Sequence, residues 1–187
     1  MRVIMLGPPG SGKSTHARLL AEHLAVAHLS VGAALRDEVA KRSPLSERIG
    51  AMVAAGELVN TTDVLAILEA PLAAATGAGG WVLDGAPRSL TQAEVLDDWL
   101  DGLEASVDCV VGLDVPDAEV RSRLLQRGRA DDTPDVIAHR LQAWQRDGGA
   151  VLNRYEEKRR VVRVDGTGGV TDVARRVTVA VEQFARS

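Results

Sequence analysis

The residues best placed to do chemistry lie in a glycine-rich run near the start of the chain. The run reads Gly7-Pro8-Pro9-Gly10-Ser11-Gly12-Lys13-Ser14 and matches the pattern G-x-x-x-x-G-K-[ST]. Glycines let such a loop curl until its backbone N–H groups point at phosphate oxygens. Lys13 can reach the β- and γ-phosphates of a nucleotide, and the Ser14 hydroxyl can ligate Mg²⁺. The run therefore predicts a phosphate-binding loop made of Gly10, Ser11, Gly12, Lys13, Ser14 and Thr15.

A second motif is Asp84-Gly85-Ala86-Pro87-Arg88, which directly follows the apolar run Trp81–Leu83. If that run is a buried parallel strand, the Asp84 carboxylate lies at its carboxyl end, where ligands bind in α/β proteins. Asp84 could hold Mg²⁺ there through water molecules. Because Asp, Gly and Pro are also common in turns, the motif indicates a metal site only in combination with the phosphate loop.

Six arginines share a third feature, since each falls at the end of an expected element or in a loop marked by glycine. They are Arg36, Arg88, Arg123, Arg127, Arg129 and Arg140. Arginine binds phosphate oxygens with two parallel N–H groups and is always charged. One such arginine alone would be interpreted as a solvated surface group, but a site for two phosphorylated ligands must neutralise several charges. His16 and His23 could form a metal pair, although solvated or packed histidines are the commoner case.

Short apolar runs alternate with stretches of helical period along the chain. We predict buried parallel strands at Arg2–Leu6, Trp81–Leu83, Val107–Leu113 and Val161–Val164, with His28-Leu29 as a weaker candidate. Helices are expected over Lys13–Leu24, Val31–Lys41, Leu45–Ala55, Thr61–Ala75, Ser89–Leu100, Asp117–Gln126, Pro134–Gln145 and Val170–Phe184. The alternation predicts one α/β domain over residues 1–187, with a central parallel sheet of about five strands and helices on both faces.

Two segments fit this alternation poorly. Residues 31–59 contain helices with no strand between them, and residues 128–133 form a short polar piece. The polar piece ends at Thr133-Pro134-Asp135, a helix start with a capping hydroxyl and a proline in the first turn. Both segments are predicted to be insertions carried by the sheet.

Composition excludes several classes of function. The 22 Lys+Arg residues against 26 Asp+Glu give a net charge of −4, which argues against a general nucleic-acid binder. No run approaches the roughly 18 apolar residues of a membrane span, and the apolar stretch before Gly7 is too short for a signal peptide. We therefore expect a cytoplasmic protein with neither a membrane nor a nucleic acid as partner. The single cysteine, Cys109, is expected to be buried and inert because it lies in an apolar run.

Phosphate loops of this kind also occur in GTP-binding switches and in ATP-driven motors. A guanine-nucleotide switch would need an Asn-Lys-x-Asp base reader, which the sequence lacks. A motor would usually be larger. Both classes are therefore disfavoured.

Together these motifs resemble the adenylate kinase family of nucleoside monophosphate kinases along almost the whole chain. The segment Leu29–Arg36 is similar to the family's acceptor-side signature, and Gly56-Glu57-Leu58-Val59 is similar to the segment whose backbone holds the acceptor base. Residues 84–92 look like the family's most specific stretch. The resemblance implies a P-loop three-layer fold with a helical acceptor-binding insertion at residues 31–59 and a short lid at 128–133. The lid has no cysteine cluster, so no zinc is expected.

The resemblance also implies roles for individual residues. The donor ATP would be bound by the phosphate loop, Arg123 and Arg127, and Mg²⁺ by Ser14 and, partly through water, by Asp84. The acceptor would be bound by Val31, Arg36, Glu57, Val59, Gly85, Arg88, Gln92, Arg129 and Arg140, with Gln92 reading adenine. The implied catalytic set is Lys13, Arg88, Arg127, Arg129 and Arg140, and Asp131 and Asp132 would orient the lid arginines.

The implied activity is reversible phosphoryl transfer from Mg·ATP to a nucleoside monophosphate by a monomer, with AMP as the expected acceptor. The chain departs from the family's usual pattern on the acceptor side, where Val31 replaces a threonine, Ala33 an aspartate and Ala86 an aromatic residue. The small Ala86 is expected to open space beside the acceptor. Asp147-Gly148-Gly149 stands where Thr-Ala-Pro is common. Two alternatives stay open, namely a kinase for a different or specialised monophosphate and a catalytically degenerate ATP-binding module.

Overall fold

The computed structural model describes residues 1–41, 43–55, 57–128 and 132–187. In this part of the chain a sheet of five strands is parallel throughout, in the order β2-β3-β1-β4-β5. The strands are β1 (Arg2–Leu6), β2 (Ala27–Ser30), β3 (Trp81–Asp84), β4 (Cys109–Asp114) and β5 (Val161–Asp165). The predicted α/β class and parallel sheet are confirmed, and the weak candidate at His28-Leu29 is a full edge strand.

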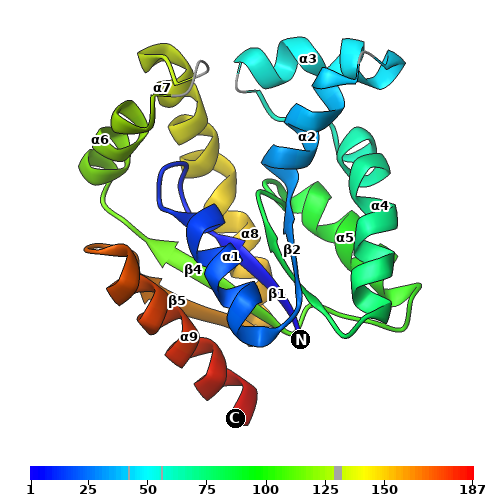
Figure 1. Cartoon of the computed structure of the whole chain (residues 1–187), viewed down its shortest axis with the longest axis vertical. Coiled ribbons are helices and arrows are strands. Elements are labelled where there is room, and N and C mark those ends of the chain that lie inside the picture. Colours follow the sequence, from blue (N-terminus) through cyan, green and yellow to red (C-terminus); the bar gives the residue numbers. More distant parts are fainter. Residues whose placement is uncertain (42, 56, 129–131) are drawn as a thin grey trace.

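Helices cover both faces of the sheet (Figure 1). Val3 and Met5 pack into one cluster with side chains of α1 (Lys13–Leu24) and α9 (Val170–Arg186). Ile4 and Leu6 belong to the opposite cluster, with side chains of α4 (Thr61–Gly77), α5 (Leu90–Asp101) and α8 (Gly149–Glu157). Successive side chains of a strand point to opposite faces, so the short run of β1 supplies both cores. The result is the three-layer arrangement implied by the resemblance.

Two groups of helices rise beyond the carboxyl edge of the sheet (Figure 1). α2 (Val31–Ala40) and α3 (Pro44–Ala55) lie between β2 and α4 along the chain, whereas α6 (Asp117–Arg127) and α7 (Pro134–Ala143) follow β4. The Thr133 side chain accepts from the Val136 N–H at the start of α7, as the capping pattern predicts. No helix in the described ranges is long and apolar enough to cross a lipid bilayer.

The largest difference from the predicted elements lies after α7. The helix expected to end at Gln145 continues through a π-helical segment, η1 (Trp144–Gly148), directly into α8, which the sequence did not predict. Two consecutive glycines normally indicate a break because glycine is a poor helix former. Here Gly148 is helical, and the Trp144 ring lies so close over it that a β-carbon would be 2.6 Å from the ring atom Cδ2.

Candidate active site

The phosphate loop joins β1 to α1, and its shape depends on glycine. Gly10 has a φ of +84°, and a β-carbon there would lie 2.7 Å from the Val120 carbonyl oxygen of α6. Any larger residue would strain the loop and collide with α6. The Lys13 Nζ donates to the carbonyl oxygens of Gly7, at 2.7 Å, and Pro8, at 2.6 Å. The ammonium group therefore lies inside the loop.

Lys13 is surrounded mainly by positive charge. Burial lowers the pKa of its ammonium group to about 7, repulsion from Arg88 and Arg127 acts in the same direction, and attraction to Asp84 opposes it. The three cations come from α1, from the loop after β3 and from the end of α6. Such an excess of positive charge is stabilised by an anion with several negative oxygens, such as a polyphosphate.

The Asp84 carboxylate, 3% exposed, lies beside this loop at the carboxyl end of β3. Its Oδ1 accepts from the Ser14 hydroxyl at 2.9 Å and from the Ser30 hydroxyl at 3.3 Å. Its Oδ2 lies 2.8 Å from His28 Nε2. The sequence analysis missed His28 and Ser30, and the available signal was their polarity in a strand that pairs with β3.

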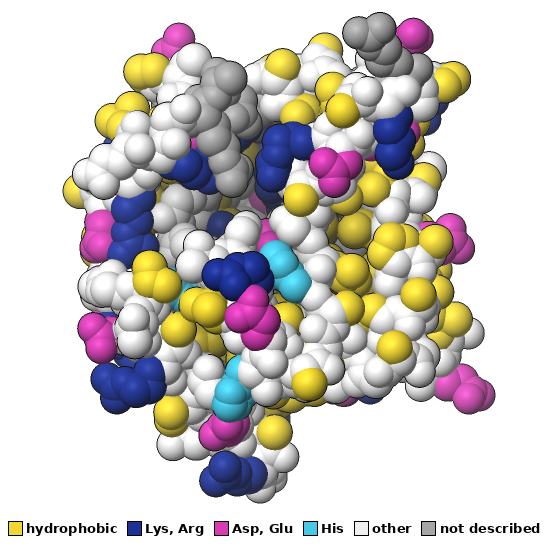
Figure 2. Space-filling view, viewed as in Figure 1, with side chains coloured by type: hydrophobic (Ala, Val, Ile, Leu, Met, Phe, Trp, Pro, Cys, Tyr) yellow, Lys and Arg dark blue, Asp and Glu magenta, His cyan; other side chains and the backbone are white. Residues whose placement is uncertain are grey.

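A hollow of about 550 Å³ contains the loop, Asp84 and most of the predicted site residues. In the space-filling view it opens between the two groups of helices, with Lys and Arg side chains on its walls (Figure 2). Because β1 is central, residues that follow β4 and β5 line one side of the loop, and residues that follow β2 and β3 line the other. These are called the β4–β5 side and the β2–β3 side below.

On the β2–β3 side the hollow is lined by Val31, Arg36, Glu57, Val59, Gly85, Arg88 and Gln92. The Gln92 side chain is held in place, because its Oε1 accepts from the Arg88 backbone N–H at 2.8 Å and its Nε2 donates to the Val59 carbonyl at 3.2 Å. In the described part of the chain the Arg36 guanidinium has no hydrogen-bond or ion-pair partner. The Gln92 amide and the Arg36 guanidinium thus lie on the same side of the hollow.

The side chain of Ala86 lies in the core and not in the wall of the hollow. The expectation was that it opens space beside the acceptor, yet Ala86 is 5% exposed and belongs to the core cluster, while Gly85 and Pro87 line the hollow. Gly85 has a φ of +90°, and a β-carbon on it would lie 3.2 Å from the Val31 Cβ. The backbone of this loop, rather than the residue 86 side chain, shapes the pocket wall.

On the β4–β5 side Arg123 links the phosphate loop to the turn after β5. It donates to the Ser11 carbonyl at 3.4 Å and to the Gly166 carbonyl at 3.0 Å, and it also pairs with Glu119. The arginine is therefore fixed beside the loop.

At the base of the predicted lid, Asp132 binds two of the predicted lid arginines. Its carboxylate, 1% exposed, accepts from Arg127 Nε at 2.7 Å and Arg127 NH2 at 2.6 Å, and from Arg140 NH1 at 3.3 Å. The predicted residues Arg129 and Asp131 lie outside the described residues. Asp132 therefore orients Arg127 and Arg140, as the resemblance implies.

The two histidines of α1 do not form a pair. His23 is exposed and lies 2.8 Å from Glu182 of α9. His16 is 3% exposed, lines the hollow, and has a buried Nδ1 with no hydrogen-bond partner among the described residues. Burial, with repulsion from Arg123 and Arg176, lowers the pKa of the His16 imidazole, so the ring is uncharged at neutral pH. The sequence analysis did not assign His16 to the nucleotide site.

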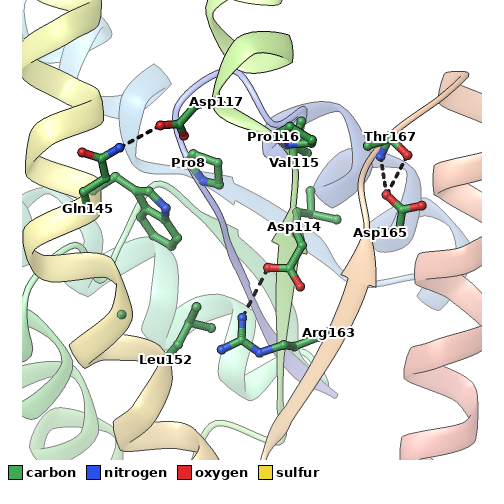
Figure 3. Close-up of a pocket in the computed structure, with 13 residues that line it drawn as sticks. Pro8, Asp114, Val115, Pro116, Asp117, Gln145, Leu152, Arg163, Asp165 and Thr167 are labelled. Carbon is green, nitrogen blue, oxygen red and sulfur yellow. Dashed lines mark hydrogen bonds and ion pairs between the residues drawn. The ribbon is translucent and has the colours of Figure 1, made fainter.

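A second hollow, of about 680 Å³, lies behind the phosphate loop (Figure 3). It shares Pro8 with the loop, and its charged side chains already have partners: Asp117 with Gln145 at 2.8 Å, and Asp114 with Arg163 at 3.3 Å. Asp165 accepts from the Thr167 hydroxyl at 2.7 Å. The convergent cations and Gln92 line the first hollow instead, which is therefore the candidate active site.

Comparison with known proteins agrees with this geometry. A sequence model of the family described as Adenylate kinase matches residues 5–160. The chain belongs to the adenylate kinase family. Among its relatives, the adenylate kinase of Synechococcus sp. (strain RCC307) is 42% identical over 96% of this chain and 97% of its own length. The adenylate kinases of Xanthomonas campestris pv. campestris (strain B100) and Stenotrophomonas maltophilia (strain R551-3) are 40% and 38% identical, over 95% and 97% of this chain and 97% and 100% of their own lengths.

Family membership confirms the predicted activity. The chain is a nucleoside monophosphate kinase, and its reaction is phosphoryl transfer between ATP and AMP. The two alternatives left open by the sequence, a specialised acceptor and a degenerate module, gain no support from the comparisons.

Proposed function

We propose that ATP binds on the β4–β5 side of the phosphate loop and AMP on the β2–β3 side, so that the phosphoryl group is transferred above Lys13. The observation that supports transfer above Lys13 is the convergence of four cations from four separate elements, and the assignment of the two sides follows the family resemblance. Lys13, Arg88 and Arg127 interact through their charges, as do Arg88 and Arg140. Mutual repulsion makes such a cluster costly unless a ligand with several negative charges binds it.

The proposed mechanism needs no covalent intermediate and no side-chain base. Lys13 and the loop amides would hold the β- and γ-phosphates, and Arg36 and Arg88 would fix the attacking phosphate. Arg127, Arg129 and Arg140 would stabilise the group in transfer. Catalysis is then positioning together with stabilisation of developing charge along an in-line path.

Mg²⁺ fits the oxygen donors beside the loop. The Ser14 hydroxyl and the Asp84 carboxylate are 2.9 Å apart, and Mg²⁺ is typically bound by one or two protein oxygens, substrate phosphates and water. Ser14 would ligate the ion directly and Asp84 partly through water. When bound, the ion would neutralise phosphate charge. His28 and Ser30 would hold the Asp84 carboxylate in orientation.

The choice of AMP follows from the hydrogen bonds that Gln92 has left. A glutamine amide has two N–H donors and a carbonyl with two lone pairs. One donor is used by Val59 and one lone pair by Arg88, which leaves one of each. Adenine offers a ring nitrogen that accepts beside an amino group that donates, so the remaining pair of groups complements that edge.

Residues 31–59 and 128–133 are proposed to move toward the sheet when both substrates are bound. Exclusion of water favours transfer over hydrolysis of ATP. All the proposed roles are filled by one chain, in keeping with a monomer. Small-angle scattering with and without an analogue that joins two adenosines through five phosphates tests the proposal. We expect a smaller radius of gyration with the analogue, and identical curves would refute closure.

The activity is tested by one phosphotransfer screen of Mg·ATP against AMP, GMP, CMP and UMP, with ATP hydrolysis alone as the control.

Lys13→Ala should lower kcat/KM more than tenfold, since a lost phosphate ligand costs at least about 1.4 kcal/mol in the transition state. The matched variant is Lys41→Ala, because Lys41 is exposed and pairs with Glu38 on the surface. Retention of more than a tenth of the activity in Lys13→Ala would contradict the assignment.

The kinetic constants of variants on each side test which substrate binds there. Arg36→Ala and Arg88→Ala should raise KM for AMP more than KM for ATP, whereas Arg140→Ala should chiefly lower kcat. Arg18→Ala is the control, since Arg18 is exposed and pairs with Glu22 at 2.5 Å on the surface of α1. If Arg36→Ala and Arg88→Ala raised KM for ATP and left KM for AMP unchanged, the assignment of the two sides would be wrong.

A further inference from the structure

The turn between β5 and α9 has its backbone held by two arginines from two different helices. Arg176 of α9 donates through NH1 to the Asp165 carbonyl and through NH2 to the Thr167 carbonyl, the second at 2.8 Å. Arg123 of α6 donates to the Gly166 carbonyl between them, at 3.0 Å. Three consecutive carbonyl oxygens therefore accept from guanidinium groups, and hydrogen bonds from a charged donor are roughly twice as strong as those between neutral groups.

The shape of this turn depends on such contacts, because its sequence imposes little order. Three of the four residues from 166 to 169 are glycine, the residue with the greatest backbone freedom. Inside the turn, the Thr167 N–H and hydroxyl both donate to Asp165 Oδ1, at 2.9 and 2.7 Å. Gly168 has a φ of +95°, and a β-carbon on it would lie 3.4 Å from Arg176 NH2. The guanidinium of Arg176 therefore packs against the turn at its most flexible residue.

The same turn forms part of the wall of the candidate active site. Gly168 and Val170 line the hollow on the β4–β5 side, and Val170 is 55% exposed. Arg176 is not among the described residues that line the hollow, although its charge contributes to the lowered pKa of His16, which does line it. The guanidinium thus lies behind the wall and can reach a ligand through the turn that it holds.

We propose that Arg176 is a positioning residue for the phosphoryl donor, and that it holds the turn after β5 in the shape that receives the base of ATP. This inference rests on the proposed placement of ATP on the β4–β5 side. An exposed valine beside a glycine without a side chain presents an apolar wall, which suits the face of a planar base. Without Arg176 the turn would sample other shapes, and only the fraction of molecules with the turn in place would bind the donor.

Arg176→Ala removes the contacts with both carbonyls. We expect KM for ATP to rise about three- to tenfold, which corresponds to a turn that keeps its binding shape in about a third to a tenth of the molecules. KM for AMP and kcat at saturating ATP should each stay within about twofold, because bound ATP selects the ordered turn. Arg176→Lys keeps the charge but not the planar fork that spans two carbonyls, so its KM for ATP should lie between those of Arg176→Ala and the unmodified protein.

Hydrogen exchange of the Thr167 amide, which donates to Asp165, measures the order of the turn without any assay of activity. In the nucleotide-free Arg176→Ala protein this amide should exchange faster than in the unmodified protein, and saturating ATP should slow it. Equal exchange rates in the two nucleotide-free proteins would overturn the inference, because the turn would then keep its shape without Arg176.

Arg175→Ala is the matched control, since it makes the same substitution one residue earlier on the same helix. Arg175 is exposed and pairs with Asp172 at 3.8 Å, so its kinetic constants should stay within about twofold of those of the unmodified protein. The inference is overturned if Arg176→Ala has the same KM for ATP as Arg175→Ala, or if kcat falls while KM for ATP is unchanged, which indicates loss of folded enzyme.

The outcomes also separate this inference from the function on which it rests. A rise in KM for AMP alone in Arg176→Ala would overturn both the inference and the placement of ATP on the β4–β5 side. Unchanged constants in Arg176→Ala, with normal transfer, would overturn the role of Arg176 alone. Failure of the proposed function would appear as absent transfer in the unmodified protein.

Discussion

Two adjacent glycines in the helix that links α7 to α8 should respond to the same substitution in opposite directions. Gly148 and Gly149 have nearly identical helical backbones, with φ and ψ of −65° and −36° for Gly148 and −62° and −42° for Gly149. Both lie inside one continuous helical run from Pro134 to Glu157. Alanine at either position therefore gains the same helix propensity, and the surroundings decide the outcome.

The magnitudes follow from what a β-carbon would meet. At Gly149 nothing lies within 4 Å, so Gly149→Ala should stabilise the protein by about 0.5–1 kcal/mol. At Gly148 the new carbon would lie 2.6 Å from Cδ2 and 2.7 Å from Cζ3 of the Trp144 ring. Overpacking of this kind costs about 1–3 kcal/mol, which exceeds the gain. Gly148→Ala should destabilise the protein by about 1 kcal/mol, so the free energies of unfolding of the two variants should differ by about 2 kcal/mol.

Thermal and urea unfolding of the two variants and the unmodified protein measure this difference. At this chain length 1 kcal/mol corresponds to about 2–4 °C in Tm. We expect Gly149→Ala to melt about 1–4 °C higher and Gly148→Ala about 2–4 °C lower, with equal urea m-values. Shifts of the same sign in both variants would refute the reasoning, because helix propensity alone would then decide the result and the Trp144 ring would not constrain residue 148.

Three further outcomes follow from buried groups. Val31→Thr should widen the preference for AMP over GMP, CMP and UMP by about two- to tenfold, because Val31 is 2% exposed in the pocket wall and offers no hydrogen bond; an unchanged acceptor ranking would contradict this. Cys109 is fully buried and the pKa of its thiol is raised to about 12, so a thiol reagent should label it only as fast as the protein unfolds, and rapid labelling of native protein would show otherwise. The hydrogen bond from Arg48 holds the pKa of Asp63 below its ordinary value of 3.8, so its contribution to stability is present at neutral pH and is lost as the pH falls below about 4. Asp63→Asn should therefore show a flatter acid limb in a plot of unfolding free energy against pH, and an identical limb would exclude the pair as a source of acid sensitivity.

The strand and helix bounds that were predicted correctly are those that depend on residues adjacent in the sequence. The bounds of β1 and α1 were correct to the residue, because an apolar strand, a glycine loop and an amphipathic helix follow one another without a break. α8 was missed since the Gly148-Gly149 pair outweighed the amphipathic pattern beyond it. Gly148 is nevertheless helical, and the ring of Trp144, four residues earlier in the same helical run, occupies the space where a β-carbon would lie.

Contacts across the chain could not be predicted in the same way. His28 and Ser30 approach Asp84 only because β2 pairs with β3, with Ser30 opposite Asp84 in the register. The prediction that Ala86 opens the acceptor pocket was wrong because the backbone of its loop turns the side chain into the core. The sequence identified the motifs that hold phosphate, but the direction of each side chain depends on the sheet order.

The central position of β1 has a consequence for the growing chain. β1 is synthesised before the other four strands of the sheet, yet its neighbours are β3, in which Asp84 pairs with Met5, and β4 still later. At about 5–20 residues per second the ribosome needs ~4–16 s to add the roughly 80 residues that separate Met5 from Asp84. Through that interval Val3, Ile4 and Met5, all fully buried in the finished protein, have no sheet to join. Gly10 in turn lies so close to α6 that a β-carbon on it would be 2.7 Å from the Val120 carbonyl oxygen, so the phosphate loop is made about 110 residues before the helix that packs against it.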